Sequence, residues 1–353
     1  MKPLHFFGLL ALVAATLHSQ PTNGAVYWST VEPDCSSLGG ETAVTIKNTS
    51  GTTLGYSCYV AGTFAWFTAG GPTGGEWSTS IRVAGPASGA IGVDYTFYDK
   101  DGNDQQVDTT FGGGSSTVAG SRVSFALYDN QPAEVTVLGA AGNGPNYSTN
   151  AKGSVYAVFY CPDASTCNDV LPQLVYSALP ANPWMLSSPI AWDNGLWTHW
   201  SAQGIDDSAT GDNYRVSLAI CNEDTTATSY RVRIYDSTGA LAGTGTTPVI
   251  PPLKDLGNGA LGEGGTYAAM LSEVIKTPLP SGVFKILIDG GSSPSYSAVE
   301  VLQFRGPSAT ALQVAYDSAP ASNVGAISSV RTLGMRSLRM QSTPKPVFRT
   351  LTK

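Results

Sequence analysis

Tryptophan is the residue whose spacing in this sequence most suggests a binding surface. Four tryptophans fall within seventeen residues: Trp184, Trp192, Trp197 and Trp200. Exposed indole rings stack on sugars or anchor protein partners, because they offer a large, rigid and partly polar surface. Tryptophan is also common in the core of a β-sandwich, and we favour core packing over ligand binding as the role of these residues. The four residues are therefore candidate ligand-binding residues with an alternative structural role.

Closely spaced aspartates offer a second kind of chemistry, the binding of a hard cation. Asp99, Asp101 and Asp104 surround Gly102, and carboxylate oxygens are ligands that calcium prefers. The same spacing suits a turn, because aspartate caps backbone N–H groups and glycine accepts a positive φ. The matching later segment, 236–240, lacks the extra acids. We therefore expect a turn and no cofactor, with calcium as the alternative.

The sequence offers little that could catalyse a reaction. It has no G-x-S-x-G motif, so a serine or cysteine nucleophile would have to use His199 as its base. His199 stands in the aromatic stretch Trp197-Thr-His-Trp200, which favours a strand position. The 26 acidic residues could include a carboxylate pair able to cleave glycosidic bonds, but no spacing selects one. No residue is predicted to be catalytic.

The five cysteines bear on compartment and stability. In an exported chain, the natural local disulfides are Cys35–Cys58 and Cys161–Cys167, although sequence alone leaves other pairings open. Cys221 is left over in an apolar run and is predicted to be a buried, inert thiol. The sequence does not favour zinc, because it has no C-x-x-C pair and His199 is the only histidine beyond the N-terminal segment.

The two ends of the chain differ from its body. Lys2 precedes an apolar run from Phe6 to Leu17, a pattern typical of a secretory signal peptide and too short for a membrane span. Residues 318–353 contain no acid and six bases, so we expect a disordered basic tail that could contact an anionic surface. No later stretch is apolar enough to be a transmembrane segment. We expect a secreted or cell-surface protein, with the periplasm as an alternative.

The body between these ends is acidic and poor in charge. Removing Lys2 and the six bases of the tail from 19 leaves 12 bases against 26 acids, a net charge of −14. Binding to nucleic acid is therefore not expected, because it needs clustered lysine and arginine. Charged residues make up 13% of the chain, whereas glycine and β-branched residues are frequent. This composition is typical of an extracellular β-protein.

An internal duplication is the strongest signal in the sequence. Residues 77–102 match residues 214–239 without a gap at an offset of 137. Apolar residues alternate in both copies, which predicts two antiparallel strands and then a Tyr-Asp-x-x-Gly turn in each. Further matches pair residues 120–127 with 264–271 and 153–159 with 282–288. The change in offset predicts a loop insertion in the second copy near residues 256–262.

Two such copies predict an all-β protein with two tandem antiparallel β-sandwich domains. A short helix is expected at 267–276, where Met270, Leu271 and Val274 share one side. The prolines near 179–183 set the predicted boundary between the domains. The assignments are 1–25 for the signal peptide, 26–180 for domain 1, 181–317 for domain 2 and 318–353 for the tail.

The second copy carries a resemblance to a known class of module. Its segments are Leu218–Asn222, Val232–Gly239, Tyr267–Glu273, Gly282–Ile286 and Ala298–Phe304. In this order they resemble the Ig-like β-sandwich modules that recur in exported bacterial proteins. The resemblance is looser in the first copy, where Gly85 stands at the position of Asn222. It implies a repeated extracellular module and brings no catalytic residue, and a fold alone assigns no function.

These features favour a secreted or cell-surface interaction or structural protein that is not an enzyme. Its partner would be an extracellular protein or a glycan. One alternative is a carbohydrate-binding module that uses exposed tryptophans. A second alternative is a secreted glycan hydrolase or lyase that uses paired carboxylates.

Overall fold

The computed structural model describes most of the chain between residues 26 and 317. The described residues are 26–38, 43–48, 50–70, 77–112, 118–141, 150–178, 185–192, 199–205, 214–257, 260–290, 297–305 and 314–317. The expected signal peptide (1–25) and basic tail (318–353) lie outside them. Within the described residues, no helix is long and apolar enough to cross a membrane.

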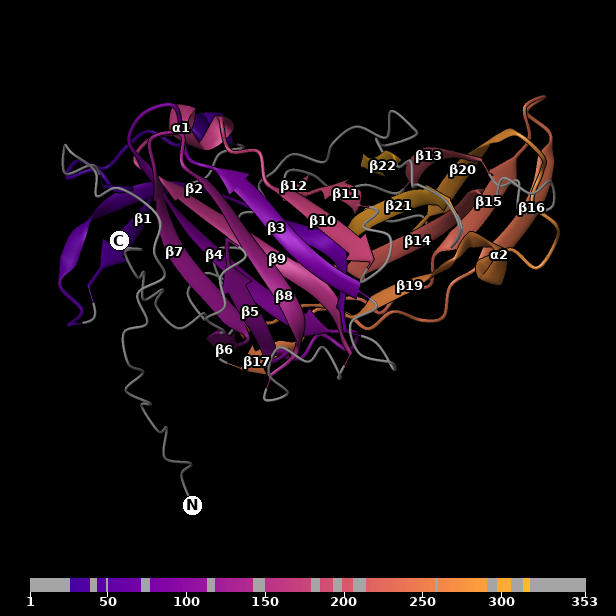
Figure 1. The fold of residues 1–353 in the computed structure, drawn as a ribbon, viewed down its shortest axis with the longest axis horizontal. Helices are drawn as coiled ribbons and strands as arrows, with labels where there is room; N and C mark the ends of the chain where they lie inside the picture. Colours follow the sequence, from indigo (N-terminus) through magenta and orange to yellow (C-terminus); the bar gives the residue numbers. More distant parts are fainter. Residues whose placement is uncertain are drawn as a thin grey trace, which may run out of the picture.

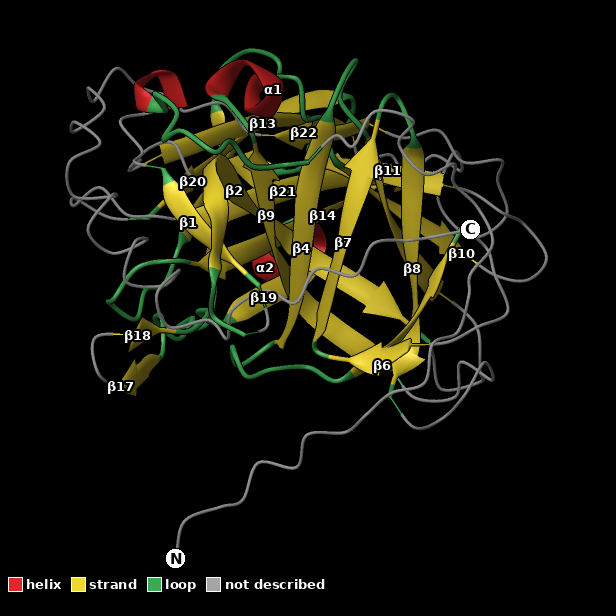
Figure 2. Cartoon of the chain, turned by 90° about the vertical axis from the view of Figure 1, so that its left-hand side faces the viewer, coloured by secondary structure: helices red, strands yellow, loops and turns green. Residues whose placement is uncertain are grey.

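The fold is all-β, as predicted, and every strand pair between named strands is antiparallel (Figure 1). The first six-stranded sheet contains β1 (Val44–Lys47), β2 (Thr53–Ala69), β9 (Ala151–Cys161), β4 (Ala90–Asp99), β7 (Arg122–Tyr128) and β12 (Ala191–Trp192). The second contains β11 (Met185–Pro189), β10 (Gln173–Ala178), β3 (Trp77–Ala84), β8 (Pro132–Ala140), β5 (Val107–Phe111) and β6 (Val118–Gly120). These two sheets face one another around one core as the first sandwich, which Figure 2 shows with β4 and β7 in front and β8 and β10 beside them.

The second sandwich is smaller. One four-stranded sheet contains β13 (His199–Ile205), β20 (Val283–Asp289), β15 (Arg231–Tyr235) and β16 (Leu241–Thr246). The other contains β19 (Thr266–Met270), β14 (Tyr214–Asn222), β21 (Ser297–Arg305) and β22 (Val314–Asp317). A short hairpin of β17 (Asp255–Gly257) and β18 (Ala260–Leu261) stands apart from both sheets, at the place of the predicted insertion.

Both sandwiches use the same order of strands. In the first, one sheet has the order β2-β9-β4-β7 and the other β11-β10-β3-β8; the second repeats these as β13-β20-β15-β16 and β22-β21-β14-β19. The equivalent strands follow one another in the same sequence order, so the duplication extends beyond the matched segments to the whole topology. The β5–β6 hairpin is an addition in the first sandwich, and β17–β18 is an addition in the second.

The strand pairing revises two details of the sequence alignment. The two strands of each matched segment, β3 with β4 and β14 with β15, do not pair with each other but lie in opposite sheets. Residues 120–127 include most of β7, which pairs with β4, whereas residues 264–271 include β19, which pairs with β14. By pairing, β7 therefore corresponds to β16, and β19 corresponds to β8.

Strand alternation explains why each sandwich has its own core. On β14, Val216, Leu218 and Ile220 face the other sheet of the second sandwich, where they meet Phe284 and Ile286 of β20. The core of the first sandwich is larger and more aromatic. It includes Phe64, Phe97, Phe125, Phe159, Ile81 and Val137.

The first sandwich extends further along the chain than the predicted boundary at residue 180. β11 pairs with β10 in register from Gln173↔Pro189 to Ser177↔Met185. β12 pairs with β2 through Ala191↔Thr63 and Trp192↔Gly62. Both strands thus complete sheets of the first sandwich before the chain enters β13.

The helix predicted at 267–276 is largely wrong. Thr266–Met270 is strand β19, and only Leu271–Val274 is helical, as α2. The segment contains good helix formers, but its backbone N–H and C=O groups pair with β14, so sheet pairing overrides local propensity. Two further helical segments, η1 (Ser36–Leu38) and α1 (Ala164–Asn168), belong to the first sandwich.

A leucine pair on the two sheets of the second sandwich tests this account of the core. Leu218 is fully buried, whereas Leu241 on β16 is 53% exposed. We expect Leu218→Ala to lower the free energy of unfolding by about 2–5 kcal/mol, because it removes packed methyl groups and leaves a cavity. Leu241→Ala is the matched control, with an expected change within about 0.5 kcal/mol. Urea unfolding followed by circular dichroism would measure both, and equal effects would contradict the assigned faces.

Candidate functional site

The contact between the two sandwiches is the most distinctive site in the described residues. The sheet that contains β14 and β21 turns its outer face toward the first sandwich. Small side chains line this face, and Ala219 and Ala298 pack against Ala65 of β2. Trp66 covers the rim of this cluster. Because small side chains let two backbones approach closely, β2 lies directly against β14 and β21.

A buried polar contact crosses the same interface. Tyr176 of β10 directs its hydroxyl toward Glu300 of β21, with Oη 3.2 Å from Oε1, and lies 2.6 Å from the carbonyl oxygen of Trp66. Burial raises the pKa of Tyr176 well above its usual value, and the charge of Glu300 adds to the effect. The tyrosine is therefore protonated at neutral pH, and its hydroxyl donates to the nearer acceptor, the carbonyl of Trp66, while it also lies within reach of Glu300.

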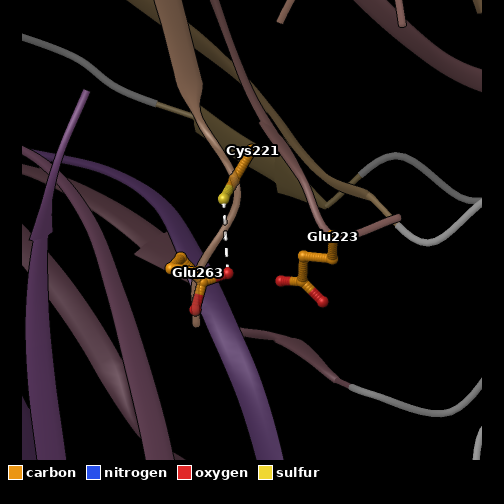
Figure 3. Close-up of side chains that lie close together, drawn as sticks. All are labelled: Cys221, Glu223 and Glu263. Atoms are coloured by element: carbon orange, nitrogen blue, oxygen red, sulfur yellow. Dashed lines mark hydrogen bonds between the residues drawn. The ribbon is translucent and has the colours of Figure 1, made fainter. Parts of the chain in front are cut away.

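Three further side chains converge beside this contact (Figure 3). Cys221 lies near the end of β14 on the face turned toward the first sandwich, Glu223 follows the strand, and Glu263 precedes β19. All three are buried, and one ligand atom from each lies within 4.8 Å of the others. The thiol of Cys221 donates to Glu263 Oε1, with Sγ and Oε1 3.6 Å apart. A thiol and two carboxylates could together hold a metal ion.

A turn of the first sandwich closes over this cluster. The N–H of Thr266 donates to the carbonyl of Lys100 at 2.9 Å. Gly102 has a φ of +74°, and a Cβ added there would lie 2.4 Å from the carbonyl oxygen of Glu263. A side chain at position 102 would therefore both strain the turn and push the two sandwiches apart.

The tryptophans predicted to bind a ligand fall in different surroundings. Trp200 on β13 is 3% exposed and packs edge-to-face against Tyr230, with ring centroids 6.0 Å apart. Its ring is part of the second core, where a sugar cannot stack on it. Trp192 lies on β12, but its side chain is outside the described residues, as are Trp184 and Trp197 entirely.

The aspartates predicted as calcium ligands form a hydrogen-bonded turn. Asp99 Oδ1 accepts from the backbone N–H groups of Asp101 and Asn103, at 2.9 and 2.8 Å. Partial burial opposes ionisation of Asp99, but hydrogen bonds from Asn103 and Asp101 hold its pKa below the usual value. Asp101 pairs with Lys100, and the backbone of Asp104 pairs with Tyr98. Calcium binding by Asp99, Asp101 and Asp104 stays a prediction.

His199 lies on the outer face of β13, opposite the core face that carries Trp200. Its Nε2 is 3.6 Å from Asp289 Oδ1, and Arg233 donates to the other oxygen of the same carboxylate at 3.1 Å. The three residues sit side by side on neighbouring strands β13, β20 and β15. This arrangement is typical of an ion-pair network on a sheet surface.

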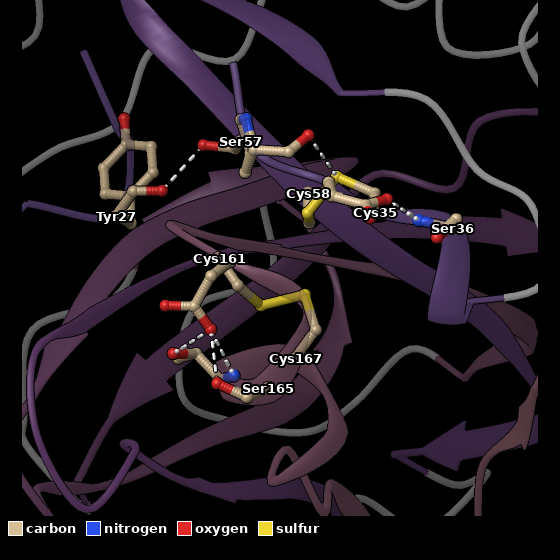
Figure 4. Close-up of a disulfide and its surroundings, with 12 residues drawn as sticks. Tyr27, Cys35, Ser36, Ser57, Cys58, Cys161, Ser165 and Cys167 are labelled. Atoms are coloured by element: carbon tan, nitrogen blue, oxygen red, sulfur yellow. Dashed lines mark hydrogen bonds between the residues drawn. A yellow bond between two sulfur atoms is a disulfide. The ribbon is translucent and has the colours of Figure 1, made fainter. Parts of the chain in front are cut away.

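Both predicted disulfides are present (Figure 4). Cys35–Cys58 joins the segment after Trp28 to β2, and Cys161–Cys167 closes a short loop after β9. Cys221 takes part in neither bond and is buried, as predicted. The loop between Cys161 and Cys167 contains α1, and Asp163 caps its first turn by accepting from the N–H of Thr166 at 2.8 Å.

Comparison with known proteins gives no assignment. No protein-family model and no curated protein matches this chain. The function must therefore be inferred from the architecture and the site.

Sequence reasoning missed the cluster of Cys221, Glu223 and Glu263. Cys221 and Glu263 are 42 residues apart, and the short ligand spacings by which zinc motifs are recognised do not cover such a separation. The sequence did contain one indication of a metal site: a cysteine inside an apolar run lies two residues before a glutamate, and both residue types can be metal ligands. The register Cys221↔Thr266 then brings the segment that carries Glu263 beside them.

The interface hydrogen bond can be tested with a pair of buried tyrosines. Tyr176→Phe removes the donor shared by the Trp66 carbonyl and Glu300 and should lower the free energy of unfolding by about 1–3 kcal/mol, because these acceptors lose a buried donor. Tyr95 is the matched control, because its hydroxyl has no hydrogen-bond partner among the described residues. Tyr95→Phe should leave stability unchanged or raise it. Urea unfolding of both variants would show the difference, and an equal loss would contradict the assigned contact.

The cap at Asp163 gives a pH-dependent prediction. Partial burial opposes ionisation, yet hydrogen bonds from Ser165 and Thr166 lower the pKa of Asp163. The ionised Asp163 therefore contributes fully to the stability of the protein above the carboxyl pKa of the unfolded chain, about 4. This stabilisation is lost as the pH falls through the lower pKa that Asp163 has in the folded protein. Asp163→Ala should cost about 1 kcal/mol at neutral pH and progressively less in acid.

Asp169, at the other end of the same helix, provides the control for this measurement. It is exposed and accepts no hydrogen bond that caps the first turn. Asp169→Ala should change stability by less than about 0.5 kcal/mol at either pH. If Asp163→Ala lowered the stability equally at neutral and acid pH, this would contradict the role of the ionised Asp163 carboxylate as the cap.

Proposed function

We propose that this protein acts outside the cytoplasm as a non-enzymatic interaction or structural protein built from two Ig-like sandwiches. The observation that carries the proposal is the buried contact between the sandwiches. Ala65 packs against Ala219 and Ala298, and Tyr176 reaches Glu300 across the same boundary. A buried interface that combines close apolar packing with a polar contact restricts motion between two modules, which suits a protein that presents its surfaces to a partner.

The Ig-like assignment is supported by the pairing of the inner strands. We number in chain order the strands that both sandwiches share. The second strand then pairs with the fifth (β3 with β8, β14 with β19), and the third pairs with the sixth (β4 with β9, β15 with β20). Strands B with E and C with F pair in the same way in immunoglobulin domains. The first, fourth and seventh strands differ from the constant-type immunoglobulin arrangement. The first and fourth lie in the sheet of the third and sixth strands, and the seventh lies in the sheet of the second and fifth.

The proposed compartment is supported by the two disulfides. Such bonds persist in secreted, surface and periplasmic proteins and are rare in the reducing cytoplasm. The signal-like N-terminal sequence and the low content of charged residues point the same way. The basic tail remains a proposed contact for an anionic surface, since an excess of lysine and arginine attracts such surfaces.

The positions of the described polar groups favour binding over catalysis. His199 is held in a network with Asp289 and Arg233. The closely spaced carboxylates Glu223 and Glu263 are at most 5% exposed, whereas a glycosidase needs its carboxylates on either side of a substrate. Trp200 is packed in the core of the second sandwich, so its burial does not support the carbohydrate-binding alternative.

The proposal is tested by expressing the full chain in its own cells. We expect it outside the cytoplasm, with four of its five cysteines oxidised and with saturable binding to intact cells or their envelope. Changing Cys35 and Cys58 together to alanine should lower stability by about 2–5 kcal/mol and reduce the binding-competent fraction. The control is a variant in which Leu241 and Val249, which are both exposed, are changed together to alanine. This variant should preserve binding.

Two results would contradict this function. Recovery of the chain in the cytoplasm with reduced cysteines would remove the proposed compartment. Turnover of envelope glycans by the purified chain would make it an enzyme, provided that the activity follows the protein through purification.

A further inference from the structure

The buried cluster of Cys221, Glu223 and Glu263 is unusual for a protein interior. The exposed fractions of these residues are 0%, 5% and 0%. Glutamate is almost never fully buried unless its charge is balanced, because moving a carboxylate out of water is costly. Two carboxylates beside a thiol raise that cost further, since like charges repel at short distance. A bound cation would balance all three groups at once.

A fourth group beside the cluster points to the same conclusion. Thr266 is 7% exposed, and its Oγ1 has no hydrogen-bond partner among the described residues. Thr266 is paired directly with Cys221 across β19 and β14. Directly opposed residues of an antiparallel pair have their side chains on the same face, about 5 Å apart. A buried hydroxyl without a partner is rare, and it lies on the face to which the thiol belongs.

The spacing of the donor atoms suits a tetrahedral ion. Zinc binds sulfur at about 2.3 Å and carboxylate oxygen at about 2.0–2.2 Å, so neighbouring ligand atoms are about 3.5 Å apart. Cys221 Sγ and Glu263 Oε1 are 3.6 Å apart, and the third ligand atom lies within 4.8 Å of both. Figure 3 shows Glu223 reaching toward the same space from the opposite side.

The chemical type of the ligand atoms indicates which metal ion would bind. Calcium and magnesium prefer ligand sets made of oxygen alone, whereas thiolate is a ligand for zinc. We propose that Cys221, Glu223 and Glu263 bind one zinc ion, with the Thr266 hydroxyl or a water that it holds near the fourth position. This site goes beyond the proposed binding function and does not depend on it.

The ion would join two chain segments of the second sandwich at the place where that sandwich meets the first. Glu263 and Thr266 belong to the segment against which the turn at Gly102 packs, and Thr266 donates to Lys100. Cys221 and Glu223 come from the end of β14, which packs on β2. Zinc would therefore link the two chain segments of the second sandwich that contact the first, in the role of a structural metal.

The experiment uses the full chain with both disulfides intact, stripped of metal by a chelator. Zinc is then titrated in a calorimeter, and cobalt is used as a spectroscopic probe. We expect one zinc per chain, a higher unfolding temperature with zinc, and thiolate-to-cobalt charge-transfer absorption. Cys221→Ser and Glu263→Gln should each weaken zinc binding at least about tenfold, the scale seen even for residues that only support metal ligands.

Glu300→Gln is the matched control, because Glu300 is buried at the same interface but bonds to Tyr176 instead. It should bind zinc as the original chain does. Circular dichroism would establish that each variant is folded. If Cys221→Ser does not fold, the cobalt spectrum of the original chain still decides, since charge-transfer absorption requires the only thiol outside the disulfides.

Three outcomes would overturn the proposal. The folded chain could bind no zinc, or it could bind zinc equally well after Cys221→Ser and Glu263→Gln. It could also bind cobalt with no thiolate absorption, which would place the ion elsewhere. In each case, the cluster would be a hydrogen-bonded part of the interface and not a metal site.

Discussion

The burial of β14 on both faces is the constraint on which the rest of the structure depends. Leu218 and Ile220 point into the core of the second sandwich, while Ala219 and Cys221 point toward the first. A strand that is covered on both sides loses the apolar–polar alternation of an ordinary sandwich strand. This explains why the stretch from Val216 to Cys221 is almost continuously apolar. It also explains why polar groups on that face, such as Glu300, require partners.

Alternation in the sequence predicted the strands that face one core, and local spacing predicted both disulfides. It did not predict β19, because Tyr267-Ala-Ala-Met has good helix formers and its conformation is decided by pairing with β14. It also aligned β7 with β19, because the apolar patterns agree while the true counterpart of β7, the glycine-containing β16, looks different. Periodicity records which face is buried, but it does not record which strand lies alongside.

The candidate metal cluster was beyond sequence reasoning for a related reason. Glu263 reaches Cys221 only because Gly264 and Gly265 allow the chain to turn closely against β14. A Cβ at Gly264 would lie 1.6 Å from the carbonyl oxygen of Asn222. Glycines in a loop predict flexibility as readily as close contact, so the contact became visible only once the register was known.

The two copies differ at the positions that form the interface in the second. At the offset of 137, Arg82 on β3 corresponds to Ala219 on β14. Arg82 pairs across the sheet with Glu134 in a solvent-exposed ion pair, whereas Ala219 lies opposite Ala268. A surface ion pair of this kind contributes little stability, so its replacement by two alanines costs little on an exposed face. The same difference removes two long charged side chains at these positions, and small side chains there allow β2 to pack closely against the sheet.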